Sequence, residues 1–194
     1  MSEDGIRLIV GLGNPGPQYE ETRHNAGFWL AERIAAAAGT AFRIDNKFHG
    51  MTCRIGVGTA EVRLLKPMTY MNHSGQSVAA LARYFDILPA QVLIAYDELD
   101  LPSGTVRLKH GGGHAGHNGM RDSIAALGSR EFWRLRIGIG HPGDKSQVVG
   151  YVLSRPSKAE AGAIHDAIDE AEHCVPELVA GKYQLVMNRL HTSR

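Results

Sequence analysis

The amino-acid sequence predicts an α/β fold: a twisted, mixed, mostly parallel sheet flanked by helices in three layers, with a C-terminal helical segment. Short apolar runs alternate with longer amphipathic stretches, as strands alternate with helices. Glycine, proline and asparagine clusters separate these runs. The chain has 194 residues, 43% of them hydrophobic and 21% charged. This size and composition fit one globular domain, and we expect a single domain over residues 1–194.

The individual elements follow in order. Residues 6–12 form an apolar run that predicts a buried strand, and Thr22 is a suitable N-cap for a helix to about Ala38. Residues 51–57 and 60–66 predict a strand pair, and Ser74 is a suitable cap for a helix to about Tyr84. The later expected elements are strands at 92–96, 105–109 and 132–139, a helix at 118–127, and a helical stretch from 158 to 190 interrupted by Pro176 and Gly181.

Polar side chains follow three of these strands. Asn14 comes after the first strand, Asn72 after the 60–66 strand and Asp97 after the 92–96 strand. If the strands are parallel, the three side chains meet at one edge of the sheet. Ligands of open α/β sheets bind at that edge. The sequence therefore places the candidate functional site there.

Composition limits the function classes. No run reaches the roughly 18 uninterrupted apolar residues of a membrane span, and the acidic N-terminus does not resemble a signal peptide. Cys53 and Cys174 form no CxxC pair, so we interpret both as reduced, small apolar residues. We therefore expect a cytoplasmic protein that does not associate with membranes.

The segment 11–16, GLGNPG, matches the glycine pattern of dinucleotide sites. In such sites the helix begins within the motif and faces the pyrophosphate. Here Pro15 and Pro17 bracket the last glycine, and the best helix start is Thr22. A tight turn that presents Asn14 is the favoured interpretation, and a dinucleotide-binding oxidoreductase is the alternative.

The glycine-rich segment 109–118 permits two kinds of site. His110, His114 and His117 lie close together and are possible zinc ligands, although a run of glycines holds ligands poorly. Glycines also allow a ligand to approach the backbone near the N–H groups of the helix expected at 118. We favour the second interpretation and expect neither metal nor cofactor. A loop without ligand is the remaining possibility.

His24 and Asp97 form the candidate catalytic pair. His24 is expected in the first turn of a helix, where the helix dipole lowers the pKa of an imidazole and keeps it able to accept a proton. A carboxylate such as Asp97 can orient the other ring nitrogen and stabilise the charge formed during catalysis. No G-x-S-x-G segment is present, which argues against a serine nucleophile.

Basic residues concentrate in one half of the chain. Residues 105–158 hold nine basic and three acidic side chains, a net charge of +6, which leaves −5 for the rest of a chain whose net charge is +1. Such a distribution allows one face to meet a polyanion. A solvated surface with no such role, or an RNA-binding module without catalysis, would give the same pattern.

Six segments in this order resemble bacterial peptidyl-tRNA hydrolases, over roughly residues 6–190. They are 11–16 (GLGNPG), 22–27 (TRHNAG), 67–75 (PMTYMNHSG), 97–100 (DELD), 111–119 (GGGHAGHNG) and 134–143 (RLRIGIGHPG). Met68 stands where we expect a small residue, and Ala115 stands where the family usually has glycine. Neither position is a proposed catalytic group.

The resemblance implies an esterase that acts on peptidyl-tRNA, releases the peptide from the 3′ ribose, and thereby recycles tRNA from aborted translation. It makes His24 the general base, Asp97 its partner, and Asn14 the residue that recognises the peptide beside the ester. A monomer without an obligate protein partner is expected. The implied substrate- and tRNA-binding residues are Tyr19, Tyr70, Met71, Asn72, Lys109, His117, Asn118, Arg136 and Lys145.

Overall fold

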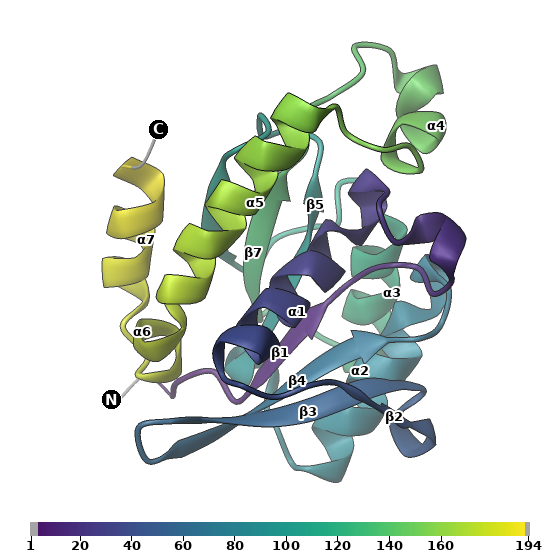
Figure 1. The fold of residues 1–194 in the computed structure, drawn as a ribbon. Helices are drawn as coiled ribbons and strands as arrows, with labels where there is room; N and C mark the ends of the chain where they lie inside the picture. The colour runs from purple at the N-terminus through teal and green to yellow at the C-terminus, as the bar shows by residue number, and fades with distance from the viewer. Residues whose placement is uncertain (1–3, 193–194) are drawn as a thin grey trace.

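A mixed seven-stranded sheet forms the middle layer of the molecule (Figure 1). The computed structural model describes residues 4–192. Its strands are β1 (Leu8–Gly11), β2 (Arg43–Asp45), β3 (Gly50–Val57), β4 (Ala60–Pro67), β5 (Val92–Glu98), β6 (Val106–His110) and β7 (Trp133–Gly138), in the spatial order β2-β3-β4-β1-β5-β7-β6. β4, β1, β5 and β7 are parallel neighbours, whereas β2, β3 and β6 add antiparallel strands at the two edges. The predicted mixed, mostly parallel sheet is confirmed.

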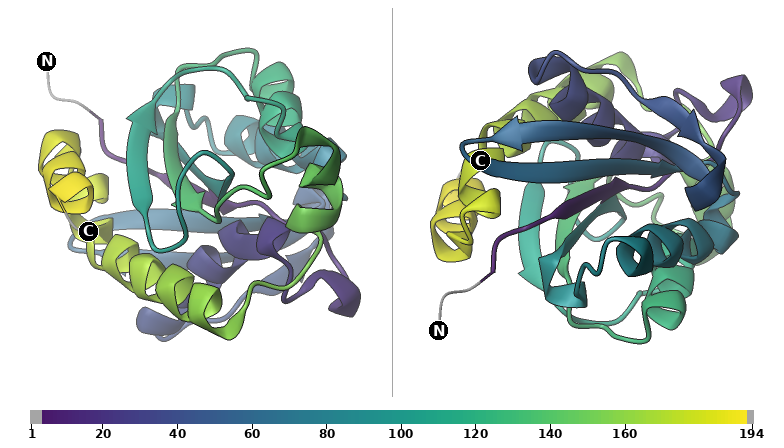
Figure 2. Two further views of the ribbon diagram at one scale, coloured as in Figure 1. Left: turned by 90° about the horizontal axis from the view of Figure 1, so that it is seen from above. Right: turned by 90° about the horizontal axis from the view of Figure 1, so that it is seen from below.

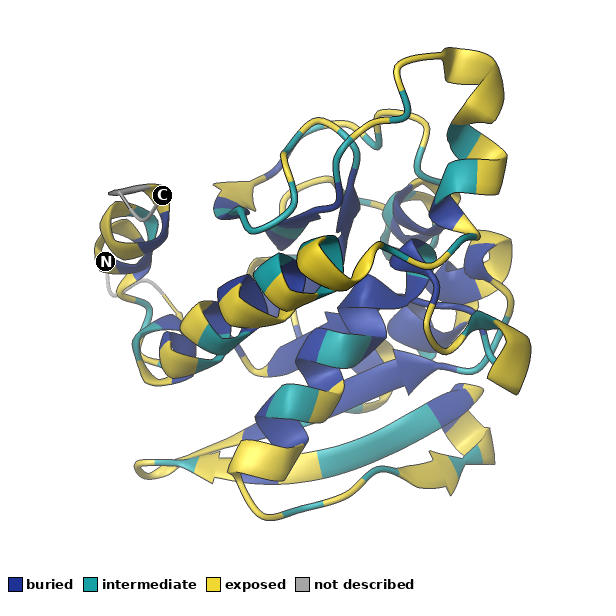
Figure 3. Cartoon of the chain, turned by 45° about the horizontal axis from the view of Figure 1, so that its top comes forward, coloured by how far each residue is buried: buried dark blue, intermediate teal, exposed yellow. Residues whose placement is uncertain are grey.

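Helices cover both faces of this sheet (Figure 2). They are α1 (Ala26–Ala37), α2 (Ser74–Tyr84), α3 (Asn118–Leu127), α4 (Val148–Val152), α5 (Lys158–His173), α6 (Val175–Val179) and α7 (Tyr183–Thr192). α1 and α5 pack on one face, where Ile9 and Leu30 belong to one apolar cluster. α2 and α3 pack on the other face, where Leu8, Val10 and Met120 belong to a second cluster. Successive side chains of β1 therefore point into the apolar cores on opposite faces of the sheet. Figure 3 shows the central strands buried between the helices.

The helix starts differ from the sequence-based expectation. α1 begins at Ala26, after a 3₁₀ turn at Arg23–Asn25, and the Thr22 hydroxyl donates to the Tyr19 carbonyl instead of capping the helix. Ser74 is the first residue of α2, and its hydroxyl donates to the Met71 carbonyl. Thr22 does stand at the N-cap position of the 3₁₀ turn that leads into α1, but its hydroxyl makes no capping bond. The predicted cap at Ser74 was wrong, because Ser74 lies inside the helix and its hydroxyl bonds backward to the preceding turn. The pattern also gave no signal for the short elements β2 and α4.

The C-terminal helices cover the open edge of the sheet. Pro176 lies in the first turn of α6, and Gly181 adopts a left-handed φ of 75° before α7. These are the two predicted interruptions of the helical stretch. The Arg107 guanidinium donates to the Leu190 carbonyl at 3.1 Å, which joins β6 to α7. Edge strands expose unpaired backbone groups, and α7 shields this one.

Among residues 4–192 we find no helix of the length and apolar character that crossing a lipid bilayer requires.

Candidate active site

Three parallel strands bring the predicted polar side chains to one edge of the sheet. β1 lies between β4 and β5, with Ile9 aligned to Leu64 on one side and to Leu93 on the other. Asn14 follows β1, Asn72 lies in the 3₁₀ turn Met71–His73 after β4, and Asp97 lies near the end of β5. The expected meeting point is therefore present at the carboxyl ends of these strands, the usual ligand-binding edge.

His24 and Asp97 are hydrogen-bonded at this edge. The Nδ1 atom of His24 lies 2.7 Å from Oδ2 of Asp97. The Asp97 side chain is 1% exposed and the His24 side chain 12% exposed. The carboxylate therefore holds one nitrogen of a ring that still reaches the surface, and Nε2 is the nitrogen left for a substrate or water.

A close backbone contact allows this pairing. A Cβ atom on Gly27 would lie 2.4 Å from the Ala95 carbonyl oxygen and 2.5 Å from the Leu12 nitrogen. Only glycine permits α1 to begin so near the ends of β1 and β5. The 3₁₀ turn that carries His24 comes directly before α1 and is thereby brought against Asp97.

Asp97 is held in its charged form. Burial by itself favours the neutral acid, but the charges and hydrogen bonds of His24 and His117 outweigh it, so the pKa of Asp97 lies well below its usual value. Burial also disfavours the imidazolium of His24, yet the Asp97 carboxylate raises the net pKa of His24. The expectation that a helix terminus lowers this pKa was wrong, because His24 lies in a turn before the helix and the carboxylate dominates.

His117 occupies the other oxygen of Asp97. Its Nε2 atom lies 2.7 Å from Oδ1, and its Nδ1 accepts a hydrogen bond from the Met120 N–H at 3.2 Å, so it is the N-cap of α3. A nitrogen that accepts from an N–H carries no proton, which places the proton of the neutral ring on Nε2. The Tyr96 ring packs edge-on at 5.1 Å. Both ring nitrogens of His117 are therefore engaged inside the protein.

Asn14 has a fixed side-chain orientation. Its Oδ1 accepts from the Met71 N–H at 2.7 Å, which leaves the Nδ2 group as the donor end of the amide. The backbone of Asn14 is held at both ends by the Asn25 side chain, with distances of 2.8 and 3.0 Å. Asn25 is 1% exposed. It was not among the predicted site residues, although an asparagine beside the candidate base was a visible signal.

Comparison with known proteins gives this arrangement a family. The peptidyl-tRNA hydrolase family model matches residues 8–194. The peptidyl-tRNA hydrolase of Nitrosospira multiformis is 55% identical over 97% of this chain and 99% of its own, and that of Methylobacillus flagellatus is 53% identical over 97% and 98%. The chain belongs to the peptidyl-tRNA hydrolase family. The crystal structure of the Acinetobacter baumannii peptidyl-tRNA hydrolase is 49% identical, with a TM-score of 0.95 over all of this chain and 97% of that one.

Membership makes the protein a hydrolase, as the resemblance of six ordered segments predicted. The dinucleotide alternative loses its structural basis. After Gly16 the chain forms two 3₁₀ turns, and the first α-helix begins only at Ala26. The helix therefore does not begin within the glycine motif, as it does in a pyrophosphate site.

Several residues assigned to substrate by the family resemblance lie at the rim of the site. Tyr70 is 57% exposed and Asn72 is also exposed, both next to the turn that follows β4. Asn118 is the exposed first residue of α3, and Tyr19 is half-buried in the 3₁₀ turn Pro17–Tyr19. Met71 is buried and presents its backbone N–H to Asn14.

Some basic side chains of the segment 105–158 are not free cations at the surface. Lys109 and Lys145 are exposed, whereas the Nε atom of Arg136 is paired with Glu98 at 2.9 Å. Arg134 is 1% exposed and donates to the carbonyls of Gly112 and Gly113. The expected surface charge was therefore too high, because part of the excess stabilises the glycine loop or is neutralised.

The zinc hypothesis at the glycine loop finds no converging ligands. His110 lies against Trp133 and 3.6 Å from Glu131, and His114 accepts from the Gly116 N–H at 3.0 Å. His117 points instead at Asp97. Within residues 4–192, the group of side chains with a metal-like donor set is His24, Asp97 and His117.

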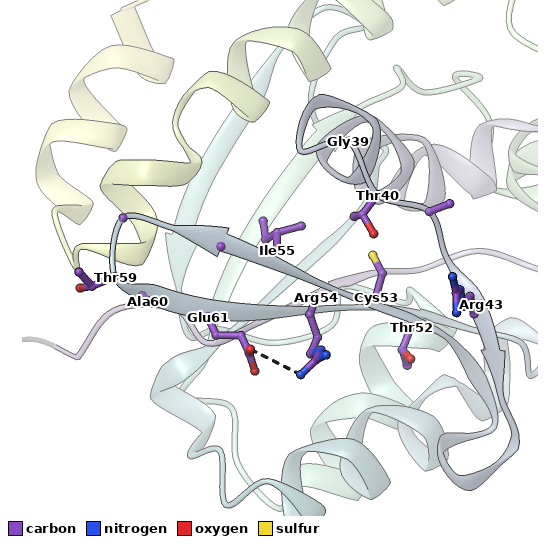
Figure 4. Close-up of a pocket in the computed structure, with 13 residues that line it drawn as sticks. Gly39, Thr40, Arg43, Thr52, Cys53, Arg54, Ile55, Thr59, Ala60 and Glu61 are labelled. Carbon is purple, nitrogen blue, oxygen red and sulfur yellow. Dashed lines mark ion pairs between the residues drawn. The ribbon is translucent and has the colours of Figure 1, made fainter.

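A groove of about 760 Å³ lies away from this site, between the end of α1 and the strands β2 to β4 (Figure 4). Among the residues that line it, Arg54 pairs with Glu61 at 3.6 Å, and Cys53 points toward Thr40. Burial raises the pKa of the Cys53 thiol, with Lys66 opposing, so it is a poor nucleophile. The groove lacks an acid–base pair like that of His24 and Asp97.

Proposed function

We propose that the protein hydrolyses the ester bond between the peptide and the tRNA in peptidyl-tRNA, with His24 as the general base. The observation that carries the proposal is the 2.7 Å contact between His24 Nδ1 and Asp97, which leaves Nε2 directed outward from a charged, buried partner. Family membership supports the choice of substrate.

In the proposed reaction, water attacks the ester carbonyl while Nε2 of His24 takes its proton. The imidazolium that forms is stabilised by the charge of Asp97. Collapse of the tetrahedral intermediate breaks the bond to the ribose oxygen, which leaves with the proton that His24 returns. The peptide is released as a carboxylic acid, and the 3′ hydroxyl of the tRNA is restored.

Asn14 is proposed to bind the carbonyl side of the ester. Its Nδ2 group is the donor end of an amide whose Oδ1 is already bonded to the backbone of Met71. Such a donor can stabilise the developing oxyanion. The neutral amide offers no counter-charge to a free α-ammonium group, so N-blocked substrates are favoured over aminoacyl-tRNA.

The tRNA is proposed to contact the rim of the site and the exposed cations. Lys109 and Lys145 are exposed and suit phosphate groups. We propose the same substrate contacts for Arg136 and the rim residues, whereas His117 acts by holding Asp97. We also propose that the protein is a single-domain monomer and that it works in the cytoplasm. The rim residues are Tyr19, Tyr70, Asn72 and Asn118, and the buried Met71 is proposed to contribute through its backbone.

The decisive experiment is hydrolysis of N-acetyl-aminoacyl-tRNA by wild type and by His24→Ala. We expect the substitution to lower kcat by about 10²–10⁴-fold, the contribution of a positioned general base. His173→Ala, a change of an exposed histidine on α5, is the matched control and should retain activity. Undiminished cleavage by His24→Ala would overturn the mechanism. Equal rates of hydrolysis for blocked and unblocked aminoacyl-tRNA would refute the proposed selectivity. If the wild type showed no turnover, the alternative of an RNA-binding module without catalysis would be favoured.

A further inference from the structure

Asp97 lies between two imidazoles, and this arrangement has the donor set of a transition-metal site. His24, Asp97 and His117 each offer one ligand atom, and these three atoms lie within 4.8 Å of one another. Two histidines and a carboxylate, with one position left for water, are typical zinc ligands. Zinc bonds of about 2.0–2.2 Å separate tetrahedral ligand atoms by roughly 3.3 Å. The two histidine nitrogens lie closer than this to the Asp97 oxygens, at 2.7 Å, so the carboxylate must move back to admit the ion.

We propose that His24, Asp97 and His117 bind one Zn²⁺ ion and that this ion inhibits the hydrolase. The proposal that zinc binds is argued from the geometry of three side chains. The proposal that zinc inhibits rests on the proposed function, because it requires His24 to be the general base.

Inhibition follows from the position of a proton on His24. Without metal, the Nδ1–H group donates to Asp97 and the lone pair of Nε2 is available. A zinc ion needs the lone pair of Nδ1, and the single proton of the neutral ring then resides on Nε2. The imidazole neither gains nor loses a proton. Its outward nitrogen becomes a donor, however, and cannot accept the proton of the attacking water.

Binding has a structural consequence at His117. Its Nδ1 accepts from the Met120 N–H, which caps α3. When Nε2 binds zinc, the proton of the neutral ring moves to Nδ1 and meets that N–H group, so the cap is lost. The zinc-bound protein therefore has a looser first turn of α3. This cost separates an inhibitory site from a resident metal centre, whose histidines donate their second N–H to an acceptor.

The test of binding does not depend on activity. The full chain, freed of metal by a chelator, is titrated with Co²⁺, whose visible absorption bands report tetrahedral coordination. We expect one equivalent to bind and Zn²⁺ to displace it. The isosteric Asp97→Asn and the ligand change His117→Asn should each weaken Co²⁺ binding at least about 100-fold. His114→Asn, which removes a nearby histidine outside the cluster, should leave the affinity unchanged. Circular dichroism confirms that each variant is folded.

Three outcomes would overturn the proposal. They are no tetrahedral Co²⁺ spectrum, a spectrum that survives in both Asp97→Asn and His117→Asn, and a spectrum lost in His114→Asn alone. Hydrogen exchange supplies an independent readout, because zinc should accelerate exchange of the Met120 amide. Unchanged exchange with zinc bound would contradict the assigned ligand nitrogen of His117.

The inhibitory half is tested with N-acetyl-aminoacyl-tRNA. Zn²⁺ at the concentration that saturates the Co²⁺ site should abolish hydrolysis, and a chelator should restore it. Full or increased hydrolysis with the site saturated would refute inhibition. Because cobalt decides metal binding even without turnover, a failure of the proposed function and a failure of the metal site remain distinguishable.

Discussion

Two charged side chains are almost completely buried on neighbouring strands, and their partners differ in kind. Asp97 on β5 is surrounded by the ring nitrogens of His24 and His117. Arg134 on β7 donates to the main-chain carbonyls of Gly112, Gly113 and Arg130. Imidazoles exchange protons near neutral pH, whereas carbonyls do not. Burial of a charged side chain is therefore not enough to mark an active site, and Asp97 differs by having two imidazoles as its partners.

Removing the negative charge of Asp97 should have the largest effect on catalysis. Asp97→Asn keeps the shape of the side chain, but it presents an N–H group to one of two imidazoles that need an acceptor. His24 then loses the tautomer that leaves Nε2 free, and we expect kcat to fall by roughly 10²–10⁴-fold. Steady-state hydrolysis of N-acetyl-aminoacyl-tRNA measures this, with exposed Asp166→Asn as control. A kcat within about tenfold of wild type would remove Asp97 from the mechanism.

The pH dependence tests the same region without a substitution. The pKa of His24 is raised, and only the neutral ring is a base. We therefore expect kcat/KM to fall on the acid side, with a midpoint above the ordinary histidine value of about 6.5. A midpoint below that value would contradict the influence of Asp97 on His24.

The free energy of unfolding should depend on pH through His24 and Asp97, in opposite directions for the two groups. The raised pKa of His24 gives stabilisation that is complete below about 6.5 and is lost as pH rises through the folded pKa. The lowered pKa of Asp97 gives stabilisation that is present above about 3.9 and is lost as pH falls. Urea unfolding across this range should locate the greatest contribution of the pair between these limits.

Arg134→Met addresses the other buried charge. The carbonyls of Gly112 and Gly113 lose their donors, and we expect the free energy of unfolding to fall by about 1–3 kcal/mol. Because the glycine loop leads to His117 and α3, KM should rise more than kcat falls. Urea titration and steady-state kinetics measure both effects, and exposed Arg130→Met is the control. A loss confined to kcat would make Arg134 part of the chemistry and end the contrast with Asp97.

The smallest expected effect concerns the loop between the two regions. Ala115 adopts a left-handed φ of 48°, which costs a residue with a Cβ about 1–2 kcal/mol. Ala115→Gly removes that cost but adds freedom to the unfolded chain, so we expect a gain of at most about 1 kcal/mol. Ala125→Gly, at an exposed position inside α3, should have the opposite sign. Urea midpoints decide this, and a destabilised Ala115→Gly would contradict the strain.

Much of the architecture was accessible from the chain alone. Apolar runs and helical patterns predicted the central strands, α3 and the interrupted C-terminal helices, because burial imposes such patterns directly on the sequence. The capping bonds expected from the hydroxyls of Thr22 and Ser74 are absent, since the partner of a hydroxyl group is settled only in three dimensions. Short elements such as β2 and α4 are too brief to leave a pattern.

The site was predicted in its members but not in its geometry. Ordered motifs and strand ends pointed to Asn14, His24 and Asp97. Two contacts were not predicted: His117 binds Asp97, and the Asn25 side chain binds the backbone of Asn14. Each joins residues that are far apart along the chain, and no local pattern specifies such pairs. The surface charge expected for residues 105–158 was too high for the same reason, because the sequence does not show whether a basic residue such as Arg134 contacts solvent or a carbonyl.

The layers, the strand ends at which polar groups gather, and the family to which the chain belongs can all be predicted from the sequence. Only the folded chain shows which nitrogen of each histidine faces Asp97, which end of the Asn14 amide is free, and which cations reach the surface. Hydrophobic periodicity is local and survives in one dimension, whereas the direction of a hydrogen bond depends on partners that only folding brings together.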